Sequence, residues 1–446
     1  MKLDRNLHVT LKFLLCFSLS HSFAISLHEA QEILFKNNPD LGNLQLEIEK
    51  SEAQLQESKA SLLPSLDALA NYSYTTEVSH LSFSLPAGPA GNIPINKELG
   101  DHDRVELGID ASYPLFTGFT RSQNLKSKHQ AIYAKEAELR AGKNQVSLKL
   151  AGMYYSWQLA ELQTEYQQKI LEHSLALQKQ LEDFVKAGTG VRSHALTAAA
   201  KAKAAEVDLL SAQNTGDSLK YELVDFLGSR DSSITNSKNA LSLDSTPIPT
   251  PDWAKENAGS NSDSLRPEIE VLERTSEQLR YSENALSGQR LPQLYALAGY
   301  RYANPGLNQT EDAFMNYGIV GLQLKWNLFD GWKNHSQKNQ LEVQLKEINE
   351  QKRKLNGAWW KSKHLAEVQF ERWEKQFQAA KASREAAEAS ANDLKRQFSV
   401  GLATGLDWLE ARNQVARATL TMSQARTMQT LAILQWRYAA GKELRF

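Results

Sequence analysis

The side chains most often used for catalysis or metal binding are scattered along this chain of 446 residues. The ten histidines form no HExxH pair, Cys16 is the only cysteine, and no glycine-rich phosphate loop is present. The five methionines do not cluster, so nothing favours a channel or site for soft metal ions. The sequence therefore predicts no enzyme, no cofactor and no metal site. The net charge of −1 does not favour nucleic acid as a partner.

Two motifs occur twice and organise the chain. Residues 63–74, LPSLDALANYSY, return as residues 291–302, LPQLYALAGYRY. Residues 113–119, YPLFTGF, return as residues 326–332, WNLFDGW. The first copy carries 15 more residues between its two motifs than the second. A tandem duplication is predicted, with one lengthened, proline-containing loop at residues 77–102 in the first copy.

The segments around these motifs alternate in polarity as strands do. Apolar residues at odd positions from Val105 to Tyr113 alternate with polar or small ones, and residues 66–74 and 320–326 show the same period. Each half thus predicts one hairpin, at about 64–116 and about 292–329, with strands long enough to span a membrane when tilted. Four strands cannot close a barrel, and lipid does not tolerate an open sheet edge. A membrane location therefore requires several copies of the chain in one barrel.

A long helix is predicted after each hairpin. Residues 119–185 and 332–399 lack proline, contain few glycines and are rich in Ala, Gln, Glu, Lys and Leu. Such helices would each be about 100 Å long, and their 3–4 apolar spacing predicts side-by-side coiled-coil packing. Gly188 and Gly401 follow these helices and can adopt the left-handed conformation that ends a helix. Return helices are expected from 196 to 226 and from 406 to 440, although a cytoplasmic coiled coil would explain either hairpin alone.

The remaining segments predict export and a division into two halves. Residues 1–24 combine basic residues, an apolar run at 13–19 and a small-x-small site at 22–24, which is typical of a signal peptide that is removed together with Cys16. A lipid anchor on Cys16 is disfavoured because Leu15 stands where lipoprotein signals carry a small residue. The first repeat is then 25–228, the second is 266–446, and a polar linker at 229–265 joins them.

This order of elements resembles the TolC-type outer-membrane efflux protein family over nearly all of the mature chain. The motifs that support the resemblance are Ser26-Leu27-x-x-Ala30 through Asn38-Pro39, Leu63-Pro64 with Leu291-Pro292, Leu115-Phe116-x-Gly118 with Leu328-Phe329-x-Gly331, and Val400-Gly401-Leu402-Ala403-Thr404-x-x-Asp407-x-Leu409-x-Ala411. The resemblance implies a mixed, mainly α fold, with long antiparallel coiled-coil hairpins forming a periplasmic α-barrel. Four transmembrane strands per chain would join a shared 12-stranded β-barrel in a homotrimer. The expected location is the cell outer membrane, extending into the periplasm.

The function implied by the resemblance is that of an exit duct in a tripartite export system, which passively conducts small molecules such as drugs. Its expected partners are a periplasmic adaptor (membrane fusion) protein, an inner-membrane transporter and outer-membrane lipid. The positions implied for adaptor docking are Ala187, Gly188, Thr189, Val400, Gly401 and Leu402. A duct for type I protein secretion is the alternative within this class. A structural coiled-coil or adhesin protein of the envelope, without transport, is the alternative from another class.

By the same resemblance, Asp407 and Glu410 match the acids that line the family's narrowest constriction. Residues three apart are neighbours on a helix, and threefold symmetry would produce two rings of three carboxylates that favour cations. The alternative is a pair of solvated surface acids. Relatives carry a basic residue at the position of Ala403 and an acid near His194, so the family's closing latch is not expected here.

Aromatic residues at the strand ends predict either an interfacial belt or local packing; they are Tyr113, Phe116, Phe119, Trp326 and Trp332.

Overall fold

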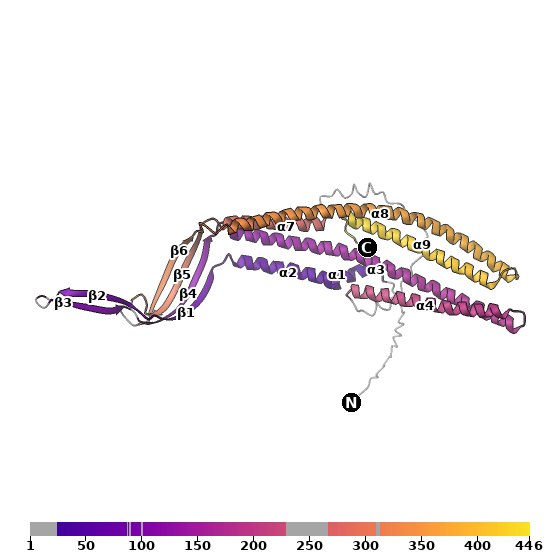
Figure 1. The fold of residues 1–446 in the computed structure, drawn as a ribbon, viewed down its shortest axis with the longest axis horizontal. Coiled ribbons are helices and arrows are strands. Elements are labelled where there is room, and N and C mark those ends of the chain that lie inside the picture. The colour runs from indigo at the N-terminus through magenta and orange to yellow at the C-terminus, as the bar shows by residue number, and fades with distance from the viewer. Residues whose placement is uncertain (1–24, 87, 89–90, 100, 229–265, 309–312) are drawn as a thin grey trace, which may run out of the picture. The chain divides into compact units, whose positions relative to one another are not determined.

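The computed structural model describes residues 25–86, 88, 91–99, 101–228, 266–308 and 313–446. The expected signal peptide at 1–24 and the expected linker at 229–265 lie outside these residues. Figure 1 traces the elements along the chain. The helices are α1 (Leu27–Asn37), α2 (Pro39–Ala60), α3 (Thr120–Lys186), α4 (Arg192–Phe226), α7 (Pro267–Gly288), α8 (Lys333–Ser399) and α9 (Gly405–Ala439). The strands are β1 (Ser65–Tyr74), β2 (Ser79–Pro86), β3 (Asn92–Leu99), β4 (Asp103–Phe116), β5 (Gln293–Asn304) and β6 (Met315–Lys325).

The described residues form two compact units, and each unit takes residues from both sequence repeats. A helical unit comprises residues 25–39, 144–228 and 362–446. A unit that contains all the described strands comprises residues 40–143 and 266–361, apart from the undescribed positions within them. Helices α3 and α8 contribute residues to both units. The two compact units therefore do not coincide with the two repeats that we infer from the sequence.

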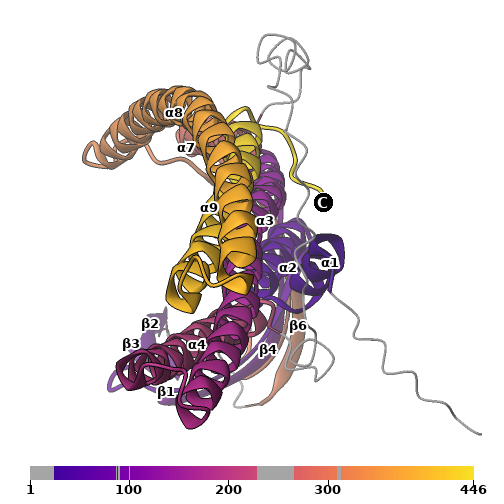
Figure 2. The ribbon, with the colours of Figure 1, turned by 90° about the vertical axis from the view of Figure 1, so that its right-hand side faces the viewer.

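The helical unit is built from long paired helices with small residues between them. Helices α3 and α8 are each 67 residues long, and α4 and α9 are each 35. Figure 2 shows α4 beside α3 and α9 beside α8. The buried positions of α4 are mostly alanine, from Ala195 to Ala212, and α9 buries a similar alanine series. Side chains this small let the helix backbones approach closely, which favours the coiled-coil pairing that the sequence predicts.

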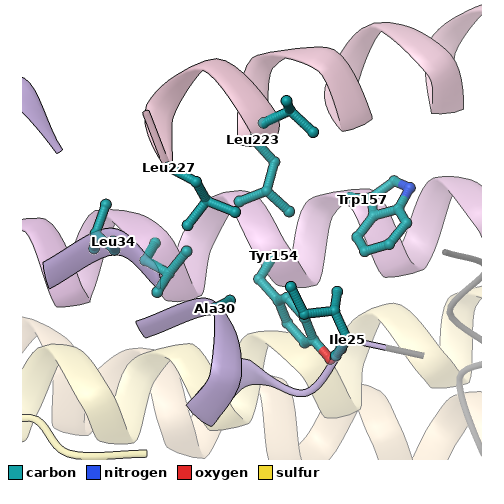
Figure 3. Packing of buried hydrophobic residues seen from close by; sticks show 9 residues of the cluster. Ile25, Ala30, Leu34, Tyr154, Trp157, Leu223 and Leu227 are labelled. Atoms are coloured by element: carbon teal, nitrogen blue, oxygen red, sulfur yellow. The ribbon is translucent and has the colours of Figure 1, made fainter. Parts of the chain in front are cut away.

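A second core in this unit joins α1 to the long helices. Figure 3 shows Ala30 and Leu34 of α1 packed with Tyr154 and Trp157 of α3, together with Leu223 of α4. The Tyr154 hydroxyl donates a hydrogen bond to the Ile25 backbone oxygen at 2.9 Å. Because the phenol is buried, this bond satisfies a polar group that would otherwise be costly to remove from water.

The strand-containing unit holds a four-stranded antiparallel sheet in the order β1-β4-β5-β6. Strands β1 and β4 pair within the first repeat, and β5 and β6 pair within the second, as the sequence predicts. The pairing of β4 with β5 joins the repeats, with Ile109 opposite Tyr300. Strands β1 and β6 are thus the outer strands of the described sheet, and each leaves one edge without a strand partner.

The two faces of this sheet differ in polarity. One face carries exposed apolar side chains from all four strands: Leu66, Leu107, Ile109, Tyr300, Val320, Leu322 and Leu324. On the opposite face Arg301 of β5 binds two carboxylates of β4, with Nε 2.7 Å from Glu106 Oε1 and Nη2 2.7 Å from Asp110 Oδ1. Gly108 leaves room for this guanidinium, because a Cβ there would lie 2.8 Å from Arg301 Cδ. The apolar face is the one that lipid could cover.

The segment expected to be a long loop, residues 77–102, is instead mostly a two-stranded ribbon. Strands β2 and β3 pair antiparallel, with Phe83 opposite Ile95 and Leu85 opposite Ile93. The loop interpretation rested on prolines at 86, 89 and 94. Pro86 ends β2, however, and Pro94 lies in a strand with only one partner, where proline is tolerated. The alternation of Leu81, Phe83 and Leu85 with serines was the signal for a strand.

The repeated glycine-aromatic motif forms the turn between strand and long helix. Gly118 and Phe119 have φ of +63° and +64°, and Gly331 and Trp332 have φ of +65° and +66°. Consecutive left-handed residues explain why glycine recurs in this motif. Phe119 packs edge-on against Phe116 at 5.4 Å, and Trp332 packs against Phe329 at 6.5 Å. The rings thus pack locally in pairs, and Phe119 and Trp332 still remain 64% and 68% exposed, as an interfacial belt requires.

Candidate functional site

All the predicted docking positions lie in two tight turns at one end of the helical unit, one between α3 and α4 and the other between α8 and α9. We call residues 184–190 the first tip and residues 397–405 the second tip. In the first tip, Gly188 has φ +73°, its N–H donates to Val185 O at 3.1 Å, and Thr189 N–H donates to Phe184 O at 3.0 Å. In the second tip, Gly401 has φ +78°. Gly401 N–H donates to Phe398 O at 3.2 Å and Leu402 N–H to Gln397 O at 2.8 Å.

Both tips therefore end a long helix in the same way, with a left-handed glycine and two backbone hydrogen bonds that reach back into the last turn. A Cβ at Gly188 or Gly401 would meet nothing within 4 Å. The glycines are thus required by backbone conformation rather than by crowding.

The tips present side chains to solvent, and the most exposed large apolar ones lie in the second tip. Ala187, Gly188 and Thr189 of the first tip are exposed. Val400 and Leu402 of the second tip are 69% and 79% exposed. Aliphatic side chains at the outer point of a turn gain nothing from solvent, which makes the second tip a candidate contact surface for another protein.

The helices that leave the two tips begin differently. At the start of α9, Thr404 and Asp407 form a capping box. Asp407 Oδ2 accepts hydrogen bonds from Thr404 Oγ1 at 2.6 Å and from Thr404 N–H at 3.0 Å, and Asp407 N–H donates to Thr404 Oγ1 at 3.2 Å. At the start of α4, Val191 has no side-chain capping bond. The second tip is therefore fixed more firmly to its return helix.

This cap also controls the charge of Asp407. The side-chain hydrogen bond from Thr404 lowers the pKa of the Asp407 carboxyl, with further lowering from the Thr404 backbone N–H and from the positive charge of Lys201 on α4. The carboxyl is exposed, so it remains ionised and accessible at neutral pH.

Glu410 lies on the same exposed face of α9 as Asp407, three residues further along. Within the described residues it has no hydrogen-bond or ion-pair partner. The 213-residue spacing that relates the two tips places His194 and Thr197 at the corresponding positions of α4. The two acids are therefore a feature of the second repeat alone, and the structure brings them to one surface of α9.

Beneath the second tip lies a packed cluster that the sequence analysis missed. The indole of Trp408 stacks on Phe398 at 6.3 Å with an interplanar angle of 6°, and meets His173 of α3 edge-on at 6.1 Å. Arg412 Nη2 lies 3.2 Å from His173 Nε2. Gly405 lies against α3, because a Cβ there would be only 2.3 Å from Leu177 Cδ1. These contacts attach the second tip to α3.

The environment of His173 favours the neutral form of its imidazole. Burial lowers its pKa, and the nearby Arg412 charge lowers it further, with a smaller opposing effect of Glu172. Since the folded-state pKa is below the unfolded value, the packed state should weaken as the pH falls below about 6.5. The sequence feature that indicates this cluster is Trp408, because the first repeat has the small residue Ala195 at the corresponding position.

Neither a metal centre nor a membrane-spanning helix emerges from the part of the chain that the structure describes. Within those ranges no three His, Cys, Asp or Glu side chains gather in a way suited to a metal ion. No helix there has the length and apolarity needed to cross a bilayer.

Comparison with known proteins shows a single consistent relationship. The family model described as outer membrane efflux protein matches residues 31–229 and 260–442. These ranges include both tips, both hairpins and the two acids of α9. A search of curated proteins gave no significant match.

Solved structures of outer-membrane proteins share this fold at low sequence identity. The CmeC outer membrane channel of Campylobacter jejuni is 16% identical with a TM-score of 0.73, over 94% of this chain and 86% of that one. The outer membrane protein VceC of Vibrio cholerae is 17% identical with a TM-score of 0.69, over 93% and 96%. The MtrE outer membrane channel of Neisseria gonorrhoeae is 15% identical with a TM-score of 0.69, over 94% and 89%.

Proposed function

Because this chain belongs to the outer membrane efflux protein family, we propose that it is the exit duct of a tripartite export system, passively conducting small molecules such as drugs out of the cell. The observation on which this proposal depends is the combination of a sheet with one exposed apolar face and a pair of helical hairpins that end in matched glycine tips. The first element suits an outer membrane, and the second suits a structure that reaches other proteins.

The edges of the sheet support the proposed assembly as a homotrimer. In the described sheet, strands β1 and β6 each have an unpaired edge, and lipid cannot satisfy the backbone groups along it. Pairing β1 of one copy with β6 of the next removes both edges, and three copies would supply 12 strands, a number within the range of natural barrels. Outer-membrane lipid would then cover the apolar face that includes Ile109, Tyr300 and Val320.

The tips are the proposed docking surface for a periplasmic adaptor, through which an inner-membrane transporter supplies the cargo. Val400 and Leu402 support this role because they are large, apolar and strongly exposed. Ala187, Gly188, Thr189 and Gly401 would contribute backbone and small side chains to the same contact.

Asp407 and Glu410 are the proposed selectivity residues of the duct. Threefold symmetry would repeat each exposed carboxylate three times about the axis, and such rings favour cations. The depressed pKa of Asp407 supports the proposal, since the side chain keeps its charge at neutral pH.

Two measurements on the purified protein test the function. Native mass measurement is expected to give a trimer, and the protein inserted into a planar lipid bilayer is expected to conduct ions. Deleting the gene should sensitise cells to drugs, and the intact gene should restore tolerance. A trimer that never conducts would point to a structural envelope protein, and conduction without any change in drug tolerance would favour protein secretion as the cargo class.

A further inference from the structure

The ribbon formed by β2 and β3 has one apolar face that nothing in the described chain covers. Cross-strand pairing places Leu81 opposite Lys97, Phe83 opposite Ile95 and Leu85 opposite Ile93, so these side chains share a face. Leu81 and Phe83 are each 45% exposed, Leu85 is 48% exposed and Ile93 is 55% exposed. The opposite face carries His80, Ser82, Ser84, Asn96 and Glu98. This pattern indicates a partner for the first face and water for the second.

A two-stranded ribbon of this kind is not expected to be stable by itself. A two-stranded hairpin is marginally stable in water at best, and an exposed apolar strand invites association. The first repeat nevertheless maintains this ribbon in an insertion that the second repeat lacks. A contact outside the described chain would stabilise it.

The ribbon is anchored close to the edge through which copies would join. The chain leaves β1 at Tyr74 and enters β2 at Ser79, a span of at most about 17 Å when extended. Thr75 N–H donates to His102 O at 2.9 Å, and the rings of Tyr74 and His102 stack at 5.8 Å, so the two ends of the insertion are tied together at the end of β1. β1 is an outer strand of the sheet. In a trimer, all three ribbons would therefore be held near copy-to-copy seams at high effective concentration.

The composition of the apolar face favours another copy over lipid. Protein surfaces that bind at a membrane interface usually carry Trp or Tyr together with Lys or Arg. The ribbon strands contain no Trp, Tyr or Arg, and their only Lys, Lys97, lies at the end of the face nearest the sheet. The rest of the face is uncharged, so identical faces can meet without burying like charges.

We propose that the apolar faces of the β2–β3 ribbons from the three copies pack against one another and form a cap at the outer mouth of the duct. The outer position follows from the order of elements. The ribbon connects the end of β1 to the start of β4, whereas α2 and α3 join these two strands at their other ends. This inference rests on the proposed trimer, and it adds an outer closure to the duct.

Single cysteines placed on either face of the ribbon test the cap. In a Cys16→Ser background, Phe83→Cys and Ile93→Cys place thiols on the apolar face, and the matched controls Ser84→Cys and Asn96→Cys place them on the polar face. Intact cells are treated with a short bis-maleimide. Each variant has one thiol per chain, so a cross-link can join only two chains. The apolar-face variants are expected to shift from monomer to dimer bands, while the polar-face variants react with a single maleimide and stay monomeric on denaturing gels.

The outcomes separate this inference from the proposed function. Equal cross-linking on both faces would overturn the cap, and so would quenching by spin-labelled lipid, without cross-linking, of a fluorophore attached to the thiol of the Phe83→Cys variant. Native mass measurement of the same samples reports assembly independently. A trimer without ribbon cross-links refutes the cap alone, and the absence of a trimer refutes the proposed function. Replacing Phe83, Leu85 and Ile93 together with Ser is expected to increase open-channel conductance in bilayers, and an unchanged conductance would contradict a closure role.

Discussion

At the scale of single residues, Asp407 and Glu410 occupy neighbouring places but have different local roles. Asp407 caps α9 through three hydrogen bonds with Thr404, whereas Glu410 has no partner among the described residues. A change at Asp407 therefore alters both charge and helix geometry, and a change at Glu410 alters charge alone. The two positions together can separate electrostatic from structural effects at the proposed constriction.

Glu410→Gln should reduce cation selectivity while leaving the protein fully folded. It removes one of the two proposed rings, so about half of the excess of cation over anion permeability should be lost. Asp407→Asn should lower selectivity to a similar degree, because its amide oxygen can still accept from the Thr404 N–H and preserve part of the cap. Single-channel recordings at about 0.01 M salt are needed, since the screening length is then about 30 Å.

The control for these variants is Thr404→Val, which removes the side-chain capping bond and keeps both carboxylates. It should lower the free energy of unfolding of the helical unit by about 1 kcal/mol without changing cation selectivity. If Glu410→Gln and Asp407→Asn leave both selectivity and block by trivalent cations unchanged, the acids are solvated surface groups and the constriction lies elsewhere.

At the scale of elements, the tips depend on the left-handed glycines. Gly401→Pro should abolish drug export, because proline cannot adopt φ +78° and removes the N–H that donates to Phe398. The local cost should be about 3 kcal/mol. Gly401→Asn is the matched variant, since asparagine tolerates the left-handed conformation and its side chain has open space around Gly401. Drug tolerance and adaptor cross-linking in cells are the measurements.

Gly188→Pro should have the same effect at the first tip, and Gly188→Asn should again be tolerated. In every variant the trimer should still form, because the substitutions lie in the helical unit and leave the strands unchanged. Normal drug tolerance and adaptor cross-linking in both proline variants would show that the tips do not dock a partner.

The sequence predicted the elements more completely than it predicted their contacts. The long helices and the strands were predicted because their periodicity is sustained over many residues. The β2–β3 ribbon was missed because prolines outweighed a short alternation that an edge strand can accommodate. The cluster of His173, Phe398, Trp408 and Arg412 was missed because it joins residues more than 200 positions apart, and only the packing of α9 on α3 brings them together. The role of Asp407 as a cap was readable from Thr404-x-x-Asp407, although the resemblance directed attention to its charge.

At the scale of the whole molecule, the two faces of the sheet determine where the protein can reside. Three features of this sheet belong together: an apolar face, a polar face with the Arg301, Glu106 and Asp110 network, and two outer strands. A soluble sheet would bury its apolar face against helices. Here those side chains stay exposed, as a lipid-facing surface requires, and the charged network lies on the face that would line the lumen.

Two adjacent residues of β6 test this orientation. Val320 and Ile319 are both β-branched, and they are 86% and 52% exposed, but successive side chains of a strand point to opposite faces. Val320→Arg places a charge on the apolar face and should cost about 2–4 kcal/mol per chain near the membrane centre, so the trimer should fail to insert. Ile319→Arg places the same charge on the face of Asp110 and should be tolerated. Heat-resistant trimer on gels of outer-membrane fractions measures the outcome. Equal loss of the trimer in both variants, or none in either, would show that neither face of the sheet meets lipid.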